Sequence, residues 1–335
     1  MRSDAPEADP RPDGREGVGA SAGLPSVVIA VLTYRRPGDI RAALPLLAEQ
    51  ALSIGSASSV RILVVDNDRD GSARDIVADA ARSTTARVDY VREDEPGISA
   101  ARNRALDEAG EDDLLVFIDD DERPTPGWLD ALLATQRSSG CAAVAGPVES
   151  RFEAAPDAWV TAGRFFDRRR PATGTVLEVA ATNNILLDMD RVRDWGLRFD
   201  SGFGATGGED TLFTRAIVAR GGIMLWAAEA RVLDIVPRAR VTHRWVVLRA
   251  MSSGNSWSRT TLALAGGRRR RTAARIVLTV HGGIRIAGGL AGISAGAVGA
   301  RLDRRARGVR TLARGVGLVS GAWGHAHEEY ARDVD

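Results

Sequence analysis

Three consecutive aspartates, Asp119, Asp120 and Asp121, directly follow the apolar run 114–118. Adjacent carboxylates repel one another, and such a group favours a divalent cation. Mg²⁺ and Mn²⁺ prefer oxygen ligands and keep positions open for phosphate oxygens. The run therefore predicts a Mg²⁺ or Mn²⁺ site that neutralises charge on a diphosphate leaving group. The alternative is an acidic helix cap or a solvated turn, which three acids in a loop often form.

A second acidic pair, Glu209 and Asp210, follows two glycines. Glycines let the backbone approach a ligand, and acids are favourable in the first turn of a helix. One of these carboxylates could serve as a general base on an acceptor hydroxyl; simple helix capping is the alternative. His243 could supply an imidazole to a metal ion, although a lone histidine more often has a structural role.

Three further polar residues suit a nucleotide ligand. Asp66 ends the apolar run 60–65 and could accept a hydrogen bond from a base or a ribose, or could cap the next helix. Arg102 and Asn103 lie near the start of a predicted helix, where a guanidinium and free amides favour an anionic diphosphate. The alternative for Arg102 is a surface position on an amphipathic helix.

The elements that would position these residues alternate between strand and helix. We predict strands at 27–32, 60–65, 88–91 and 114–118, and helices that begin at Asp39 as N-cap and span 70–81 and 99–109. Such alternation predicts a parallel sheet with right-handed crossovers. Ligands of open α/β sheets bind outside the carboxyl ends of the strands. Thr33, Asp66, Arg92 and the aspartate run should therefore share one rim.

The second half of the chain has a looser pattern. It predicts helices at 128–137 and 209–220, strands at 142–148 and 185–187, and irregular structure over 151–175.

Composition indicates a soluble globular protein, with 44% hydrophobic and 27% charged residues and a net charge of +1. Every basic residue is arginine, which is typical of GC-rich bacterial coding sequence. Cys141 is the single cysteine, so an intramolecular disulfide and a thiolate metal cluster are excluded. Residues 1–24 resemble a disordered tail without a secretory signal, and we expect a cytoplasmic protein.

Residues 268–314 contain twelve arginines and one acid, Asp303. The uncharged stretch 286–300 is shorter than the roughly 20 residues that a bilayer span requires, so we predict no transmembrane helix. Arginine-flanked, mildly apolar helices could lie on the inner face of an anionic membrane. The alternative is a helical pair that packs on the catalytic domain or on a second copy in a homo-oligomer.

Five motifs together resemble the family-2 glycosyltransferases: residues 27–36, 64–67, 97–103, 117–122 and 207–211. The resemblance covers roughly residues 25–250. It implies a GT-A fold, which is an α/β fold with a Rossmann-like, mostly parallel sheet flanked by helices. The expected nucleotide-sugar-binding half is 25–125 and the acceptor-side half is 126–250, and a basic helical extension follows at 251–335.

The resemblance also implies roles for individual residues. Asp121 would be the main metal ligand, with Asp119 as the second carboxylate and His243 as a further ligand. Asp210 would be the catalytic base, and Glu209 would help to position the acceptor. The residues implied in nucleotide-sugar binding are Thr33, Tyr34, Arg35, Asp66, Arg102, Asn103, Asp119 and Asp120, with Asp119 towards the ribose and Asp120 as a spacer. Residues 151–182 match no pattern of the family, which leaves the acceptor pocket undefined.

The predicted activity is metal-assisted single displacement, with inversion, from a nucleotide-diphosphate sugar to an acceptor hydroxyl in glycan or glycoconjugate synthesis. UDP is the first expectation for the nucleotide, and the acceptor could be a glycan, a lipid-linked sugar or a small molecule; no nucleic-acid partner is expected. A nucleotidyltransferase is an alternative, but loop 33–37 lacks its glycine-rich signature and the chain has no lysine. A catalytically inactive binding module is another, but the intact acids argue against it.

Overall fold

The computed structural model describes residues 25–55, 59–204 and 206–325. An eight-stranded sheet, with the order β3-β2-β1-β4-β9-β6-β10-β8, forms the centre of the fold. Its strands are β1 (Val27–Thr33), β2 (Val60–Asp66), β3 (Arg87–Arg92), β4 (Leu114–Asp119), β6 (Ala143–Ala145), β8 (Val176–Leu177), β9 (Asn184–Asp188) and β10 (Met224–Trp226). β1 to β4 run parallel, as predicted, whereas β9 is antiparallel to both of its neighbours, β4 and β6.

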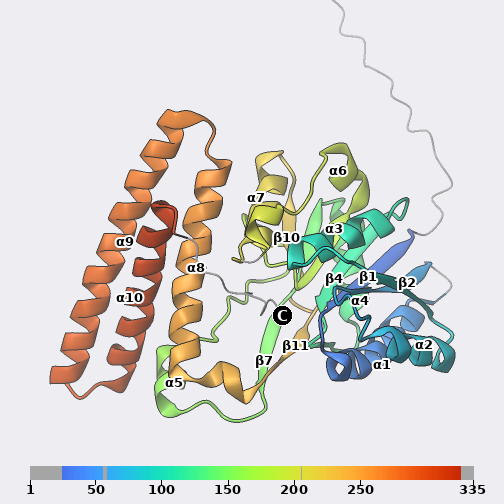
Figure 1. The fold of residues 1–335 in the computed structure, drawn as a ribbon, viewed down its shortest axis with the longest axis horizontal. Coiled ribbons are helices and arrows are strands. Elements are labelled where there is room, and N and C mark those ends of the chain that lie inside the picture. Colours follow the sequence, from blue (N-terminus) through green and yellow to red (C-terminus); the bar gives the residue numbers. More distant parts are fainter. Residues whose placement is uncertain (1–24, 56–58, 205, 326–335) are drawn as a thin grey trace, which may run out of the picture.

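The alternation of side chains along β1 divides the core into two layers. Val27, Ile29 and Val31 face one cluster, whereas Val28 and Ala30 face the other. The first cluster includes α1 (Pro37–Ser53), α2 (Arg74–Ser83) and α4 (Trp128–Ser139). The second includes α3 (Ile98–Glu108), α6 (Met189–Asp194) and α7 (Glu209–Ala219). Figure 1 shows α1 and α2 on one side of the sheet and α3, α6 and α7 on the other, the arrangement expected when both faces of a parallel sheet are covered.

The parallel register confirms the predicted rim. Thr33 is level with Asp66 and Asp66 with Arg92, while Leu32 pairs with Asp119. The carboxyl ends of four strands therefore meet at one edge of the sheet, as the alternating pattern requires.

Several predicted boundaries were wrong. Helix α1 begins at Pro37 with Arg36 as N-cap, so Asp39 lies in the first turn instead of capping it. The predicted strand 142–148 is two strands, β6 and β7 (Val148–Phe152), which are separated by Gly146 and Pro147 and lie in different sheets. The region 151–175, predicted to be irregular, contains the end of β7 and the short helix α5 (Ala158–Gly163).

A three-stranded sheet lies beside the large one, with the order β5-β11-β7. β5 (Glu122–Pro124) directly follows the aspartate run, and β11 (Val232–Val236) pairs with it antiparallel. In this register Asp234 lies opposite Glu122, so the small sheet brings a distant acid to the end of β4.

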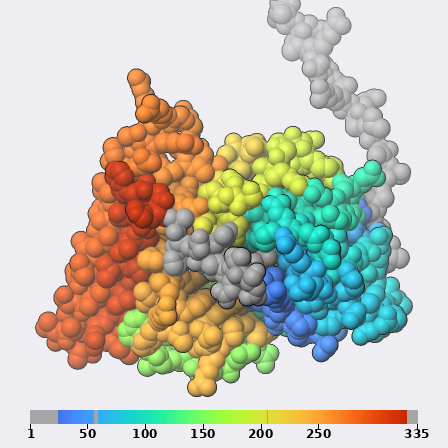
Figure 2. Space-filling model, in the orientation of Figure 1, coloured from blue at the N-terminus to red at the C-terminus, as the bar shows by residue number. Residues whose placement is uncertain are grey.

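Three long helices complete the described chain: α8 (His243–Leu264), α9 (Gly267–Val298) and α10 (Leu302–Ala322). They form one slab on one side of the molecule, coloured orange to red in Figure 2. The helical extension was predicted correctly as helix, but α8 runs without interruption across the proposed boundary at residue 250. By length and composition α9 could cross a membrane, with a mean hydropathy of 1.5 over its most apolar window; the sequence prediction considered only 286–300. The predicted tail at 1–24 lies outside the described residues.

Candidate active site

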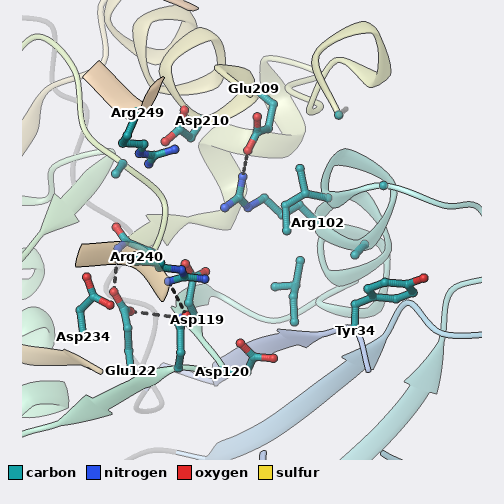
Figure 3. Close-up of a pocket in the computed structure, with 18 of the residues that line it drawn as sticks. Tyr34, Arg102, Asp119, Asp120, Glu122, Glu209, Asp210, Asp234, Arg240 and Arg249 are labelled. Carbon is teal, nitrogen blue, oxygen red and sulfur yellow. Dashed lines mark hydrogen bonds and ion pairs between the residues drawn. The ribbon is translucent and has the colours of Figure 1, made fainter. Parts of the chain in front are cut away.

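A cleft of about 1190 Å³ opens at the rim of the large sheet. The loop after β1 and the aspartate run form its floor, the start of α3 and of α7 form one wall, and α8 and α10 form the other. Figure 3 shows Asp210 and Arg249 at one end of the cleft and Asp119 and Asp120 at the other, with Arg102 between them. The structure thus brings both predicted acidic groups to one cavity.

Hydrogen bonds fix the aspartate run. Thr33 donates its hydroxyl to Asp120 Oδ2 at 2.8 Å, and Arg36 Nη1 lies 3.1 Å from Asp120 Oδ1 and 3.1 Å from Asp121 Oδ2. Arg240 Nη1 donates to the same Asp121 oxygen at 3.0 Å. Asp120, predicted as a spacer, is therefore a buried residue that holds the loop after β1 in place. It does so by accepting hydrogen bonds from Thr33 and Arg36.

Burial and mutual repulsion make Asp119 and Asp120 reluctant to ionise. Burial is the largest cause that raises the pKa of Asp119 to about 6, with Asp121 and Asp234 adding to it while Arg102 and Arg36 oppose it. Burial also raises the pKa of Asp120 to about 7, against the effect of Arg36. The positive charges present around these carboxylates therefore do not fully compensate them.

Sequence reasoning missed two acids at this end of the cleft. Glu122 is buried and accepts hydrogen bonds from Asn183 Nδ2 at 2.6 Å and from the Asp119 amide at 3.2 Å. Burial, together with Asp119, raises its pKa well above the usual value. Asp234 pairs with Arg168 at 2.9 Å. Glu122 could have been found from its position beside the run, but Asp234 arrives through the pairing of β11 and carries no local signal.

The other predicted acids lie at the start of α7. Glu209 is buried, and one of its carboxylate oxygens is paired with Nη1 of Arg102, while Oε2 is buried without a hydrogen-bond partner among the described residues. Burial raises the pKa of Glu209, opposed by Arg102. Glu209 thus holds Arg102 in the cleft wall, whereas Asp210, which also lines the cleft, is the acid more open to a substrate.

The predicted nucleotide contacts divide into two groups. Tyr34, Arg35 and Arg102 line the cleft, together with Asn67, which was not predicted. Arg35 has a left-handed backbone conformation with φ of 52°, and its Nε atom lies 3.5 Å from Asp68 Oδ1. These residues form an edge where a base or a phosphate could bind.

Asp66 and Asn103 do not line the cleft. Asp66 is fully buried and accepts from the amides of Asp68 at 3.1 Å and Ala73 at 2.9 Å, so it shapes the loop after β2. Asn103 exchanges two 2.9 Å hydrogen bonds with the backbone of Phe199. Both side chains are committed to the fold, which argues against direct contact with the nucleotide.

His243 also lies away from the predicted metal site. Its Nε2 is 2.6 Å from Asp157 Oδ2, and its ring packs 4.3 Å from the indole of Trp159. Asp157 caps α5 and Thr242 caps α8, so His243 joins two helix starts. The prediction of a metal ligand here is not supported by this geometry.

The remaining wall is aromatic and basic, and no sequence motif predicted it. Phe165, Phe166 and Trp245 contribute rings, with Phe166 and Trp245 stacked at 6.1 Å between centroids. Arg310 and Arg314 reach the cleft from α10. Aromatic surfaces with a few charged groups are typical of small-molecule sites.

Comparison with known proteins assigns the chain to a family. The model of glycosyl transferase family 2 matches residues 27–194. The succinoglycan biosynthesis protein ExoM of Rhizobium meliloti is 34% identical over 242 residues, which are 72% of this chain and 77% of ExoM. The glycosyltransferase AglE of Haloferax volcanii is 24% identical over 173 residues, which are 52% of this chain and 56% of AglE.

Solved structures of low identity share the fold. A structure of GalNAc-T7 with UDP, GalNAc and Mn²⁺ aligns with a TM-score of 0.52 at 13% identity, over 72% of this chain and 48% of that one. The structure of residues 1–349 of S. aureus TarS aligns with a TM-score of 0.51 at 13% identity, over 85% and 90% of the two chains. The GT-A fold expected from the motifs is thereby confirmed.

The family match spans the strands whose ends build the cleft floor, and ExoM extends the similarity over most of the chain. A nucleotidyltransferase and an inactive binding module are no longer needed as explanations. The chain is a glycosyltransferase that belongs to glycosyl transferase family 2.

Proposed function

We propose that this enzyme transfers a sugar from a nucleotide-diphosphate donor to an acceptor hydroxyl by a single displacement with inversion, in the synthesis of a surface glycan or glycoconjugate. The observation that carries the proposal is the presence of Asp210 and the aspartate run at opposite ends of one cleft. A base and a leaving-group site on opposite sides of the reacting carbon are what an in-line displacement requires.

In this proposal the oxygen of the acceptor hydroxyl attacks C1 of the donor sugar, and Asp210 accepts the proton that this hydroxyl loses. The bond between C1 and the phosphate oxygen breaks, the nucleoside diphosphate departs with the electron pair, and the configuration at C1 inverts. Arg102, held by Glu209, presents a fixed positive charge in the cleft wall. Such a preoriented charge stabilises the leaving group more than a mobile one.

The aspartate run fits a divalent cation. Asp119 and Asp120 have raised pKa values, and two guanidinium groups already gather at one oxygen of Asp121. Among the described residues no three His, Cys, Asp or Glu side chains converge as a ready metal site. Mg²⁺ is commonly held by one or two carboxylates plus substrate phosphates, so Asp121 and Asp119 are the residues we assign to it. Bound there, Mg²⁺ or Mn²⁺ would neutralise charge on the diphosphate.

UDP remains the first candidate for the donor nucleotide, a choice supported by the UDP-bound structure of GalNAc-T7. The similarity to a succinoglycan biosynthesis protein supports a glycan acceptor. We also propose that the protein is cytoplasmic and that its chain divides into a donor half, an acceptor half and a helical extension.

Asp210→Asn tests the assignment of the base. We expect a loss of transfer of about 10²–10⁴-fold, with affinity for UDP and Mn²⁺ within twofold of wild type by calorimetry. Asp130→Asn is the matched control, because Asp130 is an exposed acid in the first turn of another helix, α4. Substantial activity in Asp210→Asn would refute the base, and a product that keeps the donor's anomeric configuration by NMR would refute inversion.

A further inference from the structure

Helix α9 turns its large apolar side chains outward. Ile276, Val280, Ile284 and Val298 are 53–92% exposed on the described chain, and Val277 and Leu290 are about half exposed. Ile276, Val280 and Ile284 follow one another at intervals of four residues, which places them along one side of the helix. This outer surface, residues 276–298 of α9, is called the α9 face below.

The inner side of α9 is lined by glycines instead. Gly282, Gly289 and Gly296 are buried at intervals of seven residues. A Cβ atom on Gly289 would lie 2.6 Å from the Leu312 amide nitrogen, and one on Gly282 would lie 2.9 Å from the Gly315 carbonyl. The backbones of α9 and α10 therefore lie in close contact, so the large side chains of α9 are left on its other side.

The charge on α9 is of one sign. The helix carries Arg268–Arg271, Arg275 and Arg285 and contains no acidic residue. Arg268–Arg271 are exposed at its start, and Arg285 is exposed near its middle. A cationic helix with an apolar outer face is complementary to an anionic lipid surface.

We propose that the α9 face lies in the interfacial region of an anionic bilayer, parallel to the membrane plane. A span is disfavoured because Arg285 would reach the hydrocarbon centre and α10, packed alongside, carries arginines of its own. Long arginine side chains at the helix start can reach the headgroups from an in-plane position. The predicted membrane contact thus acquires a defined surface.

Flotation of the full chain with vesicles tests this surface. We expect binding to vesicles of phosphatidylcholine with phosphatidylglycerol, weak binding to phosphatidylcholine alone, and release by alkaline carbonate. Val280→Glu with Ile284→Glu should reduce binding at least tenfold, whereas Val176→Glu, an equally exposed apolar residue on β8, should leave it unchanged. Circular dichroism checks that both variants remain folded.

Three outcomes would overturn the proposal. These are vesicle binding that survives the α9 substitutions, protein that stays with the vesicles in carbonate, and a wild-type dimer by light scattering that the substitutions convert to monomer. The last result would assign the α9 face to a second copy of the chain.

A separate observation concerns the opposite side of the bundle, where α10 lines the cleft. Arg310 donates to the carbonyl of Arg164 at 2.6 Å, which holds it at the end of α5. Arg314 lies one helical turn further on, and among the described residues it makes no ion pair with a carboxylate. Burial lowers the pKa of Arg314, and the charged groups that face it, Arg285, Arg310 and Arg169, lower it further.

Other arginines of the cleft form ion pairs with carboxylates: Arg36 with Asp120 and Asp121, Arg240 with Asp121, and Arg168 with Asp234. We infer that Arg310 and Arg314 receive a phosphate group of the acceptor. Two guanidinium groups on one helix face suit a doubly charged phosphate. This inference rests on the proposed function, since it places the acceptor on the α10 side of Asp210.

Binding of inorganic phosphate, measured by calorimetry with UDP and Mg²⁺ saturating, tests the site without turnover. Arg314→Gln should weaken phosphate binding at least tenfold, whereas Arg304→Gln, on the exposed side of α10, should not. Equal affinity in Arg314→Gln would overturn the inference, whatever Asp210→Asn does to transfer. A soluble glycosyl phosphate and an isoprenyl phosphate in detergent, compared on the same variants, distinguish a free from a lipid-linked acceptor.

Discussion

The guanidinium of Arg102 on α3 is paired with the carboxylate of Glu209 on α7, and their side chains are only 8% and 5% exposed. The two residues are 107 positions apart in the sequence. The pair ties the helix after β3 to the helix that carries Asp210. Arg102 also lies over the ring of Phe199, 5.4 Å from its centroid, so its guanidinium has a single well-defined position in the cleft wall.

Arg102→Ala should be strongly destabilising, because it leaves Glu209 buried without its charge partner. Breaking a buried pair in this way typically costs about 3–5 kcal/mol, measurable by urea denaturation. Arg82→Ala is the control, since Arg82 and Asp79 form an exposed pair on α2, and such pairs contribute about 0–1 kcal/mol. An equal decrease in the free energy of unfolding in the two variants would show that the buried pair contributes no more to stability than the exposed pair.

The aspartate run should make the metal-free protein less stable as the pH rises. The folded-state pKa of Asp120 is raised to about 7 from 3.8, so the folded chain binds more protons than the unfolded chain between these values. The contribution of Asp120 to the free energy of unfolding is therefore fully present at pH 4 and below, and it is lost as the pH rises towards 7. Asp119, raised to about 6, acts in the same direction.

Asp120→Asn removes this penalty and keeps an acceptor for the Thr33 hydroxyl. We expect its melting temperature at pH 7.5, without metal, to rise by about 2–4 °C, which corresponds to about 1 kcal/mol in a chain of this size. At pH 4.5 the variant and the wild type should melt together. A variant that is less stable at pH 7.5 would mean that the contact with Arg36 outweighs the cost of burial.

Removal of metal should abolish sugar transfer, and the concentration of metal that the enzyme requires should depend on Asp121. EDTA is expected to abolish activity, and excess Mn²⁺ to restore it. Asp121→Asn should raise the Mn²⁺ concentration for half-maximal activity at least about tenfold, because a charged oxygen ligand is lost. An unchanged Mn²⁺ requirement in this variant, or full activity in EDTA, would contradict the metal assignment.

Gly146 is the point at which the chain leaves the large sheet for the small one. A Cβ atom there would lie 2.1 Å from the Ala230 carbonyl and 2.6 Å from Asn184 Nδ2. Gly146→Ala should therefore destabilise the fold by roughly 1–3 kcal/mol through overpacking. Gly38→Ala in α1, where nothing lies within 4 Å, should be neutral or slightly stabilising in the same denaturation experiment.

The rim of the cleft could be predicted from the sequence because strand ends in a parallel sheet are level with one another. The predicted buried strands are followed directly by Thr33, Asp119, Asp120 and Asp121. A correct prediction of the strands therefore also gave the positions of these residues. The limit of this logic is Asp66. It ends a strand like the others, but its side chain turns into the loop it stabilises, and no sequence pattern distinguishes these orientations.

The other half of the cleft depends on tertiary contacts that leave no local pattern. Asp234 reaches the acids through pairing of β11 with β5, and Arg240 follows in the short 3-10 helix Arg238–Val241 that precedes α8. His243 is the reverse case: its residue type suggested a metal ligand, whereas the structure places its Nε2 atom 2.6 Å from Asp157 Oδ2. The apolar length of α9 was underestimated because Arg285 interrupts the sequence run without ending the helix.

Helix α8 is shared between the cleft and the C-terminal hairpin. Its Trp245 and Arg249 line the cleft, while on another side Ser258 donates to the Leu318 carbonyl at 2.8 Å. A Cβ atom on Gly317 would lie 1.9 Å from the Met251 carbonyl, so α10 rests directly on the α8 backbone. A chain shortened after residue 266 would not be a smaller version of this enzyme, because the helix that walls its substrate site would lose its support.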